Sequence, residues 1–225
     1  MVCGVALSAQ APPHLPPLDR LLPARAEAVY VAVTPRVDAT VAMDVVRAIG
    51  PLWRLAGNPA FEESQQVIFA RLAAAGLSPR YESFPNDGMA WEQVRGTLRL
   101  GDANGEVLLS RERDRVALAI NSFSTPEGGI TARLVDVGRG VEANDYAGLD
   151  VTGAVVLASG PIGPAWRQAV KARGALGVVS TDLAAYTRPD DTPDVLQWGS
   201  IPFDEPVHGF GFKAPPRAEI GRAHV

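Results

Sequence analysis

The clearest hydrophobic pattern in the chain is a series of short apolar runs separated by glycine-rich turns in residues 129–182. Residues 154–158 and 176–180 are both apolar and β-branched, which predicts strands buried on both faces of a sheet. Between them we expect a helix that begins at Pro164 and ends at Gly174. Its apolar side consists of Trp166, Ala169 and Val170. Two strands joined by a helix form a right-handed crossover, so we expect the strands to be parallel.

Other short strands are expected around this crossover. The turn at 101–105 predicts a hairpin between residues 91–100 and 106–110. Four more segments have the pattern of strands: Thr131–Val137, Val116–Ile120, Trp198–Phe203 and Phe210–Lys213.

The chain before residue 86 has a helical pattern instead. Asp38 is suited to cap a helix that Gly50 and Pro51 stop, and its apolar residues at helical spacing are Val41, Val45, Val46 and Ile49. Asn58 and Pro59 predict the start of a second helix, and Gly76 predicts its end. On the second helix, Ser64, Ile68, Leu72 and Ala75 are expected to share one face. A strand is expected at residues 80–84.

The first residues resemble the end of a secretory signal. Small apolar residues lead to Ala9-Gln10-Ala11, an A-x-A cleavage pattern, so we expect residues 1–11 to be a signal remnant and the protein to be exported. Residues 12–37 contain several prolines and are expected to be extended.

Composition excludes several classes of protein. The 225 residues have a mean hydropathy of +0.05 and a net charge of −4, and their lysines and arginines are scattered without a run, which argues against a nucleic-acid binder. No apolar run approaches the roughly 20 residues that span a bilayer. A single cysteine, Cys3, excludes an internal disulfide and a cysteine-built zinc site.

Several segments of this pattern resemble the protease-associated domain, in the form inserted into secreted two-zinc exopeptidases of the aminopeptidase and glutamate-carboxypeptidase type (clan MH). Each segment is short, but their order and spacing match the domain. Residues 53–85 also resemble the opening of these exopeptidases, whose first helix pair packs outside the catalytic sheet. The segments that match the inserted domain are Leu134–Gly138, Asp145–Tyr146, Asp150–Gly153, Val155–Ala158 and Gly174–Val179.

The resemblance implies an α+β chain. Residues 38–85 would form two helices and the first strand of an α/β zinc-peptidase domain. Residues 86–219 would form a mainly-β protease-associated domain that contains the βαβ crossover and its return segment.

The resemblance further implies the N-terminal fragment of a secreted or periplasmic zinc exopeptidase, with an aminopeptidase favoured over a carboxypeptidase. The parent enzyme would hold two zinc ions and act on peptides, while the inserted domain shapes substrate access. The partners expected for this chain are therefore the rest of the catalytic domain and the parent's peptide substrate. One alternative is a stand-alone protease-associated domain that binds peptides or proteins without catalysis. A subtilase can also carry this domain, but nothing before Gly129 resembles its catalytic motifs.

The last six residues have a different origin in our interpretation. Residues 220–225 correspond to the translation of ATC GGA AGA GCA CAC GTC, which matches a widely used sequencing adapter. We therefore expect a non-native tail and a natural gene that continues beyond Glu219.

The sequence assigns no catalytic, cofactor-binding or metal-ligating residue to this chain. Two-zinc exopeptidases need a His-x-Asp pair, and none of the histidines (His14, His208 and His224) is followed two residues later by aspartate. The Glu62-Glu63 pair precedes the place where the family has its Glu-Glu pair, so it is not carried over. We therefore expect the fragment to bind no zinc and to be inactive.

Three other features have structural interpretations. The acidic loop with Asp190, Asp191 and Asp194 lacks the order of a calcium loop. The turn at Gly160–Gly163 lacks the Gly-Lys-Ser/Thr of a phosphate loop. Trp166, Trp198 and Phe210 are expected to be core residues.

Overall fold

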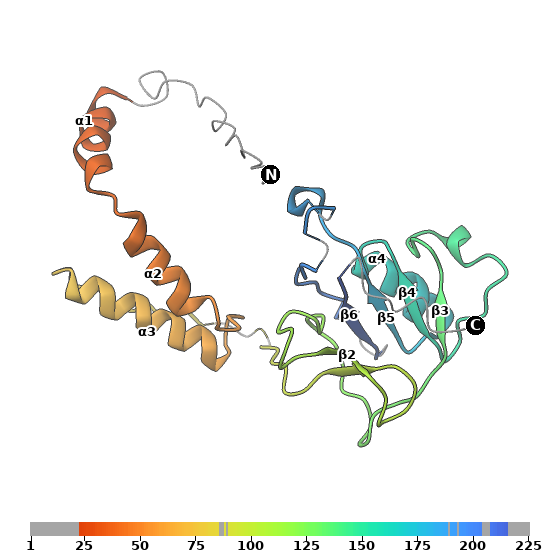
Figure 1. Cartoon of the computed structure of the whole chain (residues 1–225). Coiled ribbons are helices and arrows are strands. Elements are labelled where there is room, and N and C mark those ends of the chain that lie inside the picture. The colour runs from red at the N-terminus through yellow and green to blue at the C-terminus, as the bar shows by residue number, and fades with distance from the viewer. Residues whose placement is uncertain are drawn as a thin grey trace, which may run out of the picture.

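The computed structural model describes residues 23–85, 88, 90–188, 190–192, 194–203 and 208–215. These residues form an α+β structure, as the sequence predicts. The predicted signal remnant, the 220–225 tail, Cys3, His14 and His224 lie outside the described residues. Figure 1 shows helices α1, α2 and α3 on one side and a sheet on the other, and we call these the helical region (residues 23–76) and the sheet region (residues 90–215).

A four-stranded parallel sheet forms the centre of the sheet region. Its strands lie in the order β3-β4-β5-β6. Their bounds are β3 Leu134–Asp136, β4 Val155–Ala158, β5 Gly177–Ser180 and β6 Phe210–Lys213. The predicted crossover is confirmed, because β4 and β5 are parallel neighbours with Val156 opposite Val178.

The apolar residues of the central strands pack on both faces of the sheet. Val156 and Val178 belong to a core cluster with Trp166 and Val170, on the face that the crossover helix covers. Val155, Leu157 and Val179 belong to a second cluster with Leu109 of the hairpin. This alternation explains why the strands have continuous apolar runs.

The crossover helix begins earlier than the sequence predicts. Helix α4 spans Ile162–Trp166 and continues as the π-helical segment η4, Arg167–Lys171. Pro164 is therefore its third residue, within the first turn, where a missing N–H leaves no intrahelical bond unmade. Gly174 follows with a φ of 70°, which confirms the predicted glycine stop.

The predicted hairpin is present, and two of the other predicted strands are not. Strands β1 (Thr97–Arg99) and β2 (Val107–Ser110) pair antiparallel. Residues 116–120 and 198–203 form only isolated bridges, Leu118 with Phe212 and Ile120 with Ser200. The Ala119 amide nevertheless donates to the Gly211 carbonyl (2.8 Å), so residues 117–119 cover the outer edge of β6.

In the helical region, two helices agree with the sequence and one was not predicted. Helix α1 (Ala24–Val33) lies in the segment that we expected to be extended, because an alanine-rich run between Pro23 and Pro35 favours a helix. Helix α2 (Ala39–Ile49) begins after Asp38, whose carboxylate accepts from the Thr40 amide. Short 3-10 helices are η2 Thr34–Arg36, η3 Ala143–Tyr146 and η5 Ala185–Thr187.

Helix α3 (Pro59–Ala74) has both of its predicted ends. The Asn58 side chain accepts from the Phe61 amide at 2.9 Å. At the other end Gly76 has a φ of 82°, and the Leu77 amide donates to the Leu72 carbonyl at 3.1 Å. Local capping chemistry alone therefore fixes the bounds of this helix.

Removing this cap should weaken α3 measurably. We expect Asn58→Ala to lower the free energy of unfolding of α3 by about 1 kcal/mol, because the Phe61 amide loses its side-chain acceptor. Asn58→Ser keeps an acceptor and should lose less. Hydrogen exchange of the α3 amides measures both variants, and equal losses would contradict the capping role.

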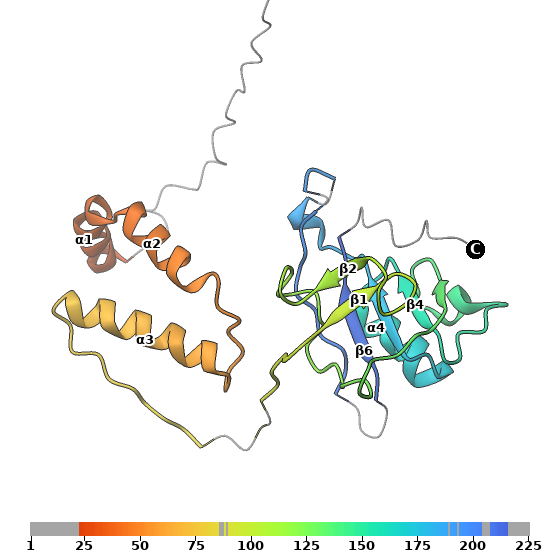
Figure 2. The same ribbon diagram turned by 60° about the horizontal axis from the view of Figure 1, so that its bottom comes forward.

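The apolar side chains of the helical region remain largely uncovered. Residues 80–84 form no strand, because no neighbouring strand pairs with them among the described residues. Tyr81 instead stacks on Phe69 (4.8 Å between ring centroids), and Phe84 is 80% exposed. Figure 2 shows residues 77–84, which we call the link, as an extended segment that follows α3. Large apolar residues exposed on α2, α3 and the link are Val41, Met43, Val46, Ile68, Leu72, Leu77, Tyr81 and Phe84.

An aromatic contact joins the helical region to the sheet region. Trp53, in the connection between α2 and α3, packs edge-on against Trp91 with 6.4 Å between ring centroids. The Trp91 indole N–H donates to the Ser122 carbonyl (3.1 Å), which fixes Trp91 to the sheet region. This contact joins the α2–α3 connection to the first residues after the link.

Candidate functional site

The most unusual polar group of the described residues is a buried lysine at the carboxyl end of the sheet. Lys213 ends β6 and is 3% exposed, and its backbone partner in register is Ser180 at the end of β5. Its Nζ donates to the Asp182 carbonyl and to the Ser180 hydroxyl oxygen (3.4 Å). The Ser180 hydroxyl donates in turn to the Gly160 carbonyl (2.9 Å). One amine thus links the ends of three neighbouring strands.

This serine and lysine do not form a nucleophile and its base. The Ser180 proton is directed to the Gly160 carbonyl, and Lys213 donates to Ser180 rather than accepting from it. Ser180 is fully buried, so a substrate has no access to its oxygen. Catalysis by an activated serine needs a base that accepts its proton and a reachable hydroxyl. The arrangement is therefore a structural clamp.

The charge of this amine makes stability depend on pH. Burial lowers the pKa of Lys213, and attraction to Asp182 opposes this only in part. Between the lowered pKa and the ordinary lysine value of about 10.4, the unfolded chain binds more protons than the folded one, so stability rises with pH. We expect Lys213→Met to remove this rise relative to the parent chain.

Urea unfolding at several pH values between 7 and 10 measures the effect. As the pH rises, the free energy of unfolding of the parent chain should increase relative to that of Lys213→Met. Lys171→Met is the matched control, since Lys171 is the chain's other lysine and is exposed on the crossover helix. Parallel pH curves for the parent and Lys213→Met would show that the amine is not perturbed by folding.

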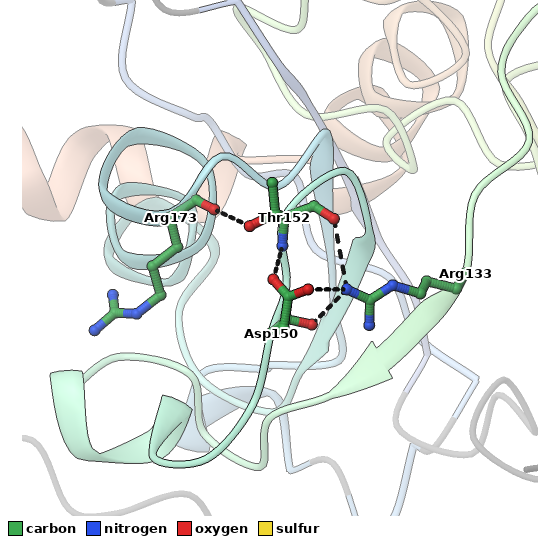
Figure 3. A network of polar contacts seen from close by, with 4 residues as sticks. All are labelled: Arg133, Asp150, Thr152 and Arg173. Carbon is green, nitrogen blue, oxygen red and sulfur yellow. Dashed lines mark hydrogen bonds and ion pairs between the residues drawn. The ribbon is translucent and has the colours of Figure 1, made fainter.

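A second polar network holds the turn before β4 (Figure 3). Arg133 Nη2 donates to the Asp150 carbonyl (2.6 Å) and lies 3.3 Å from the Asp150 carboxylate. The Thr152 amide donates to that carboxylate (2.9 Å), which lowers the pKa of Asp150. The Thr152 hydroxyl lies 3.5 Å from the Arg173 carbonyl at the end of the crossover helix. These contacts position the turn, and both charged side chains of the ion pair are solvent-exposed.

The neighbouring turn at 140–146 is also fixed by its own residues. The Asp145 carboxylate accepts from the Val141 amide (2.8 Å) and the Glu142 amide (3.0 Å). The buried Tyr146 hydroxyl donates to the Gly140 carbonyl (2.9 Å), and the Arg173 guanidinium lies 4.4 Å from its ring centroid. Burial raises the pKa of Tyr146 to about 12. Asp145 and Tyr146, two residues of the resemblance, therefore have clear structural roles.

His208 is the one histidine within the described residues, and it lies in an aromatic stack. Its ring is 4.2 Å from that of Phe123 and nearly parallel to it, while Phe203 stacks on Phe123 at 5.8 Å. This contact explains the position of His208 without a metal.

The other features considered from the sequence are not brought together. Glu62 and Glu63 are exposed at the start of α3. In the acidic loop, Asp191 forms an exposed ion pair with Arg188 at 3.4 Å. Gly160 is buried, and a Cβ there would lie 2.5 Å from the Arg139 carbonyl, which agrees with a structural turn.

The three aromatic residues expected in the core differ in burial. Trp166 is fully buried, and Phe210 is half-buried against the second core cluster. Trp198 is 59% exposed, so its assignment to the core is wrong: its segment forms no regular strand that would turn it inwards.

Within the part of the chain that the structure describes, no group of three or more histidine, cysteine or acidic residues could hold a metal ion. In the same residues, no helix has the length and apolar character to cross a membrane.

The sequence analysis does not identify the Lys213 clamp. The only available signal was a lysine at the end of an otherwise apolar strand.

Comparison with known proteins gives matches among solved structures only. No protein-family model matches the chain, and a search of curated proteins finds no match. Similar solved structures are BSAP, a zinc aminopeptidase from Bacillus subtilis (20% identity, TM-score 0.45), and an aminopeptidase from Aneurinibacillus sp. strain AM-1 (21%, 0.41). A peptidase M28 precursor from Shewanella amazonensis SB2B is also similar (16%, 0.44). The matches cover 75%, 80% and 80% of this chain, which spans 36%, 39% and 44% of those chains.

Proposed function

We propose that this chain is the N-terminal part of an exported zinc-dependent exopeptidase, with aminopeptidase activity favoured. The sheet region would be its protease-associated domain, which shapes the access of peptides to a catalytic cleft. The order and spacing of the motifs support this. Three of them coincide with β3, β4 and the glycine stop followed by β5 in one parallel sheet.

The observation that carries the proposal is the uncovered apolar surface of the helical region. Val41 and Val46 of α2 and Leu72 of α3 are exposed, although capped helices of a stable domain normally bury an apolar stripe. The predicted strand at 80–84 has no strand to pair with among the described residues. A catalytic sheet supplied by further chain would cover the helices and pair with this segment.

The residues present here do not fit a zinc site. The sequence has no His-x-Asp pair, and the described residues contain no cluster of metal ligands. When bound in the parent, zinc would activate the attacking water. We therefore derive no catalytic step for this chain and propose that it is inactive alone.

One observation favours a second candidate, a protease-associated module that binds peptides or proteins without catalysis. The sheet region has its own core clusters on both faces of the sheet, which is what an independently folding domain requires. The capped helices before residue 77 argue against this alternative, since a binding module has no need for them.

The decisive experiment is to recover the genomic DNA beyond codon 219 and to express the intact protein. We expect a His-x-Asp motif within roughly the next hundred residues, about the length of one domain. The intact protein should bind zinc stoichiometrically and hydrolyse amino-acid anilides, while residues 1–219 alone should do neither. Cleavage of anilides, rather than of substrates with a free carboxyl end, distinguishes an aminopeptidase.

Two results would contradict the proposal. A natural stop codon soon after codon 219 would favour the binding module. Stoichiometric zinc on residues 1–219 alone would show that the chain contains a metal site of its own.

A further inference from the structure

We draw no further inference here: the strongest candidate, the uncovered apolar face of α2, α3 and residues 77–84, carries nothing beyond the proposed function because nothing in the structure shows what covers it.

Discussion

Replacing Trp166 by alanine should lower the free energy of unfolding of the sheet region by about 3–5 kcal/mol. Trp166 is 0% exposed and lies in the core cluster between the crossover helix and the sheet, with Val156 and Val178. Removal of the indole leaves a large cavity that the close-packed backbones of α4, β4 and β5 cannot fill. Because domains of this size are stable by about 5–15 kcal/mol, much of the sheet region's stability would be lost.

Trp198 provides the matched control for this variant. It is also a tryptophan of the sheet region but is 59% exposed, so Trp198→Ala should change stability by less than about 0.5 kcal/mol. Native-state hydrogen exchange of the β4 and β5 amides measures the sheet region separately from the helices. If Trp166→Ala lowered the free energy of unfolding as little as Trp198→Ala, Trp166 would not be packed between the crossover helix and the sheet.

A variant with an aromatic replacement tests how much of the effect comes from the volume of the indole. The buried Trp166 Nε1 has no hydrogen-bond partner within the described residues. Trp166→Phe therefore leaves no acceptor unpaired and removes only part of the volume, so it should cost clearly less than Trp166→Ala.

The predictions that hold depend on local sequence or on a buried pattern. Caps such as Asn58 and stops such as Gly174 act through neighbouring residues, so their signals appear directly in the chain. The continuous apolar runs of β4 and β5 predict burial on both faces, and the crossover rule then makes them parallel.

The predictions that fail depend on partners distant in sequence. Residues 80–84 have the composition of a strand, but a strand also needs a neighbour to accept its hydrogen bonds. Residues 116–120 and 198–203 do find neighbours, but the pairing is limited to isolated bridges. The helix at Ala24–Val33 is a different case, because there local helix propensity, and not a distant partner, outweighs the extended conformation that the neighbouring prolines favour.

The same distinction explains what could be predicted about the functional site. The absence of a His-x-Asp motif is a property of the sequence alone. The Lys213 clamp instead requires that β5 and β6 be neighbours in register, although 29 residues of sequence (181–209) separate these strands. The lysine's burial followed from the sheet order, which the sequence pattern did not specify.

The order of the strands also determines how much a single methyl group added to β6 lowers the free energy of unfolding. A Cβ at Gly211 would lie 2.8 Å from Ile162 Cδ1, 2.9 Å from Ile201 Cγ2 and 3.2 Å from Ala119 Cβ. Ala119, Ile162 and Ile201 are all in the core cluster and have little room to move. We expect Gly211→Ala to lower the free energy of unfolding of the sheet region by about 1–3 kcal/mol, and Gly211→Val to lower it further.

Gly163 offers the matched control, because an added Cβ meets no packed core side chain there. Gly163 is the second residue of α4, and the nearest atom outside the helix to an added Cβ is the Ser200 carbonyl oxygen at 3.6 Å, an ordinary contact. Gly163→Ala should therefore destabilise the sheet region clearly less than Gly211→Ala, because the higher helix propensity of alanine is opposed only by the restriction that Pro164 places on the residue before it. Hydrogen exchange of the β5 and β6 amides compares the two variants directly. If Gly211→Ala left these amides as protected as in the parent chain, then β6 would not pack against Ile162 and Ile201, and the assignment of Phe210–Lys213 to the edge of the sheet would have to be revised.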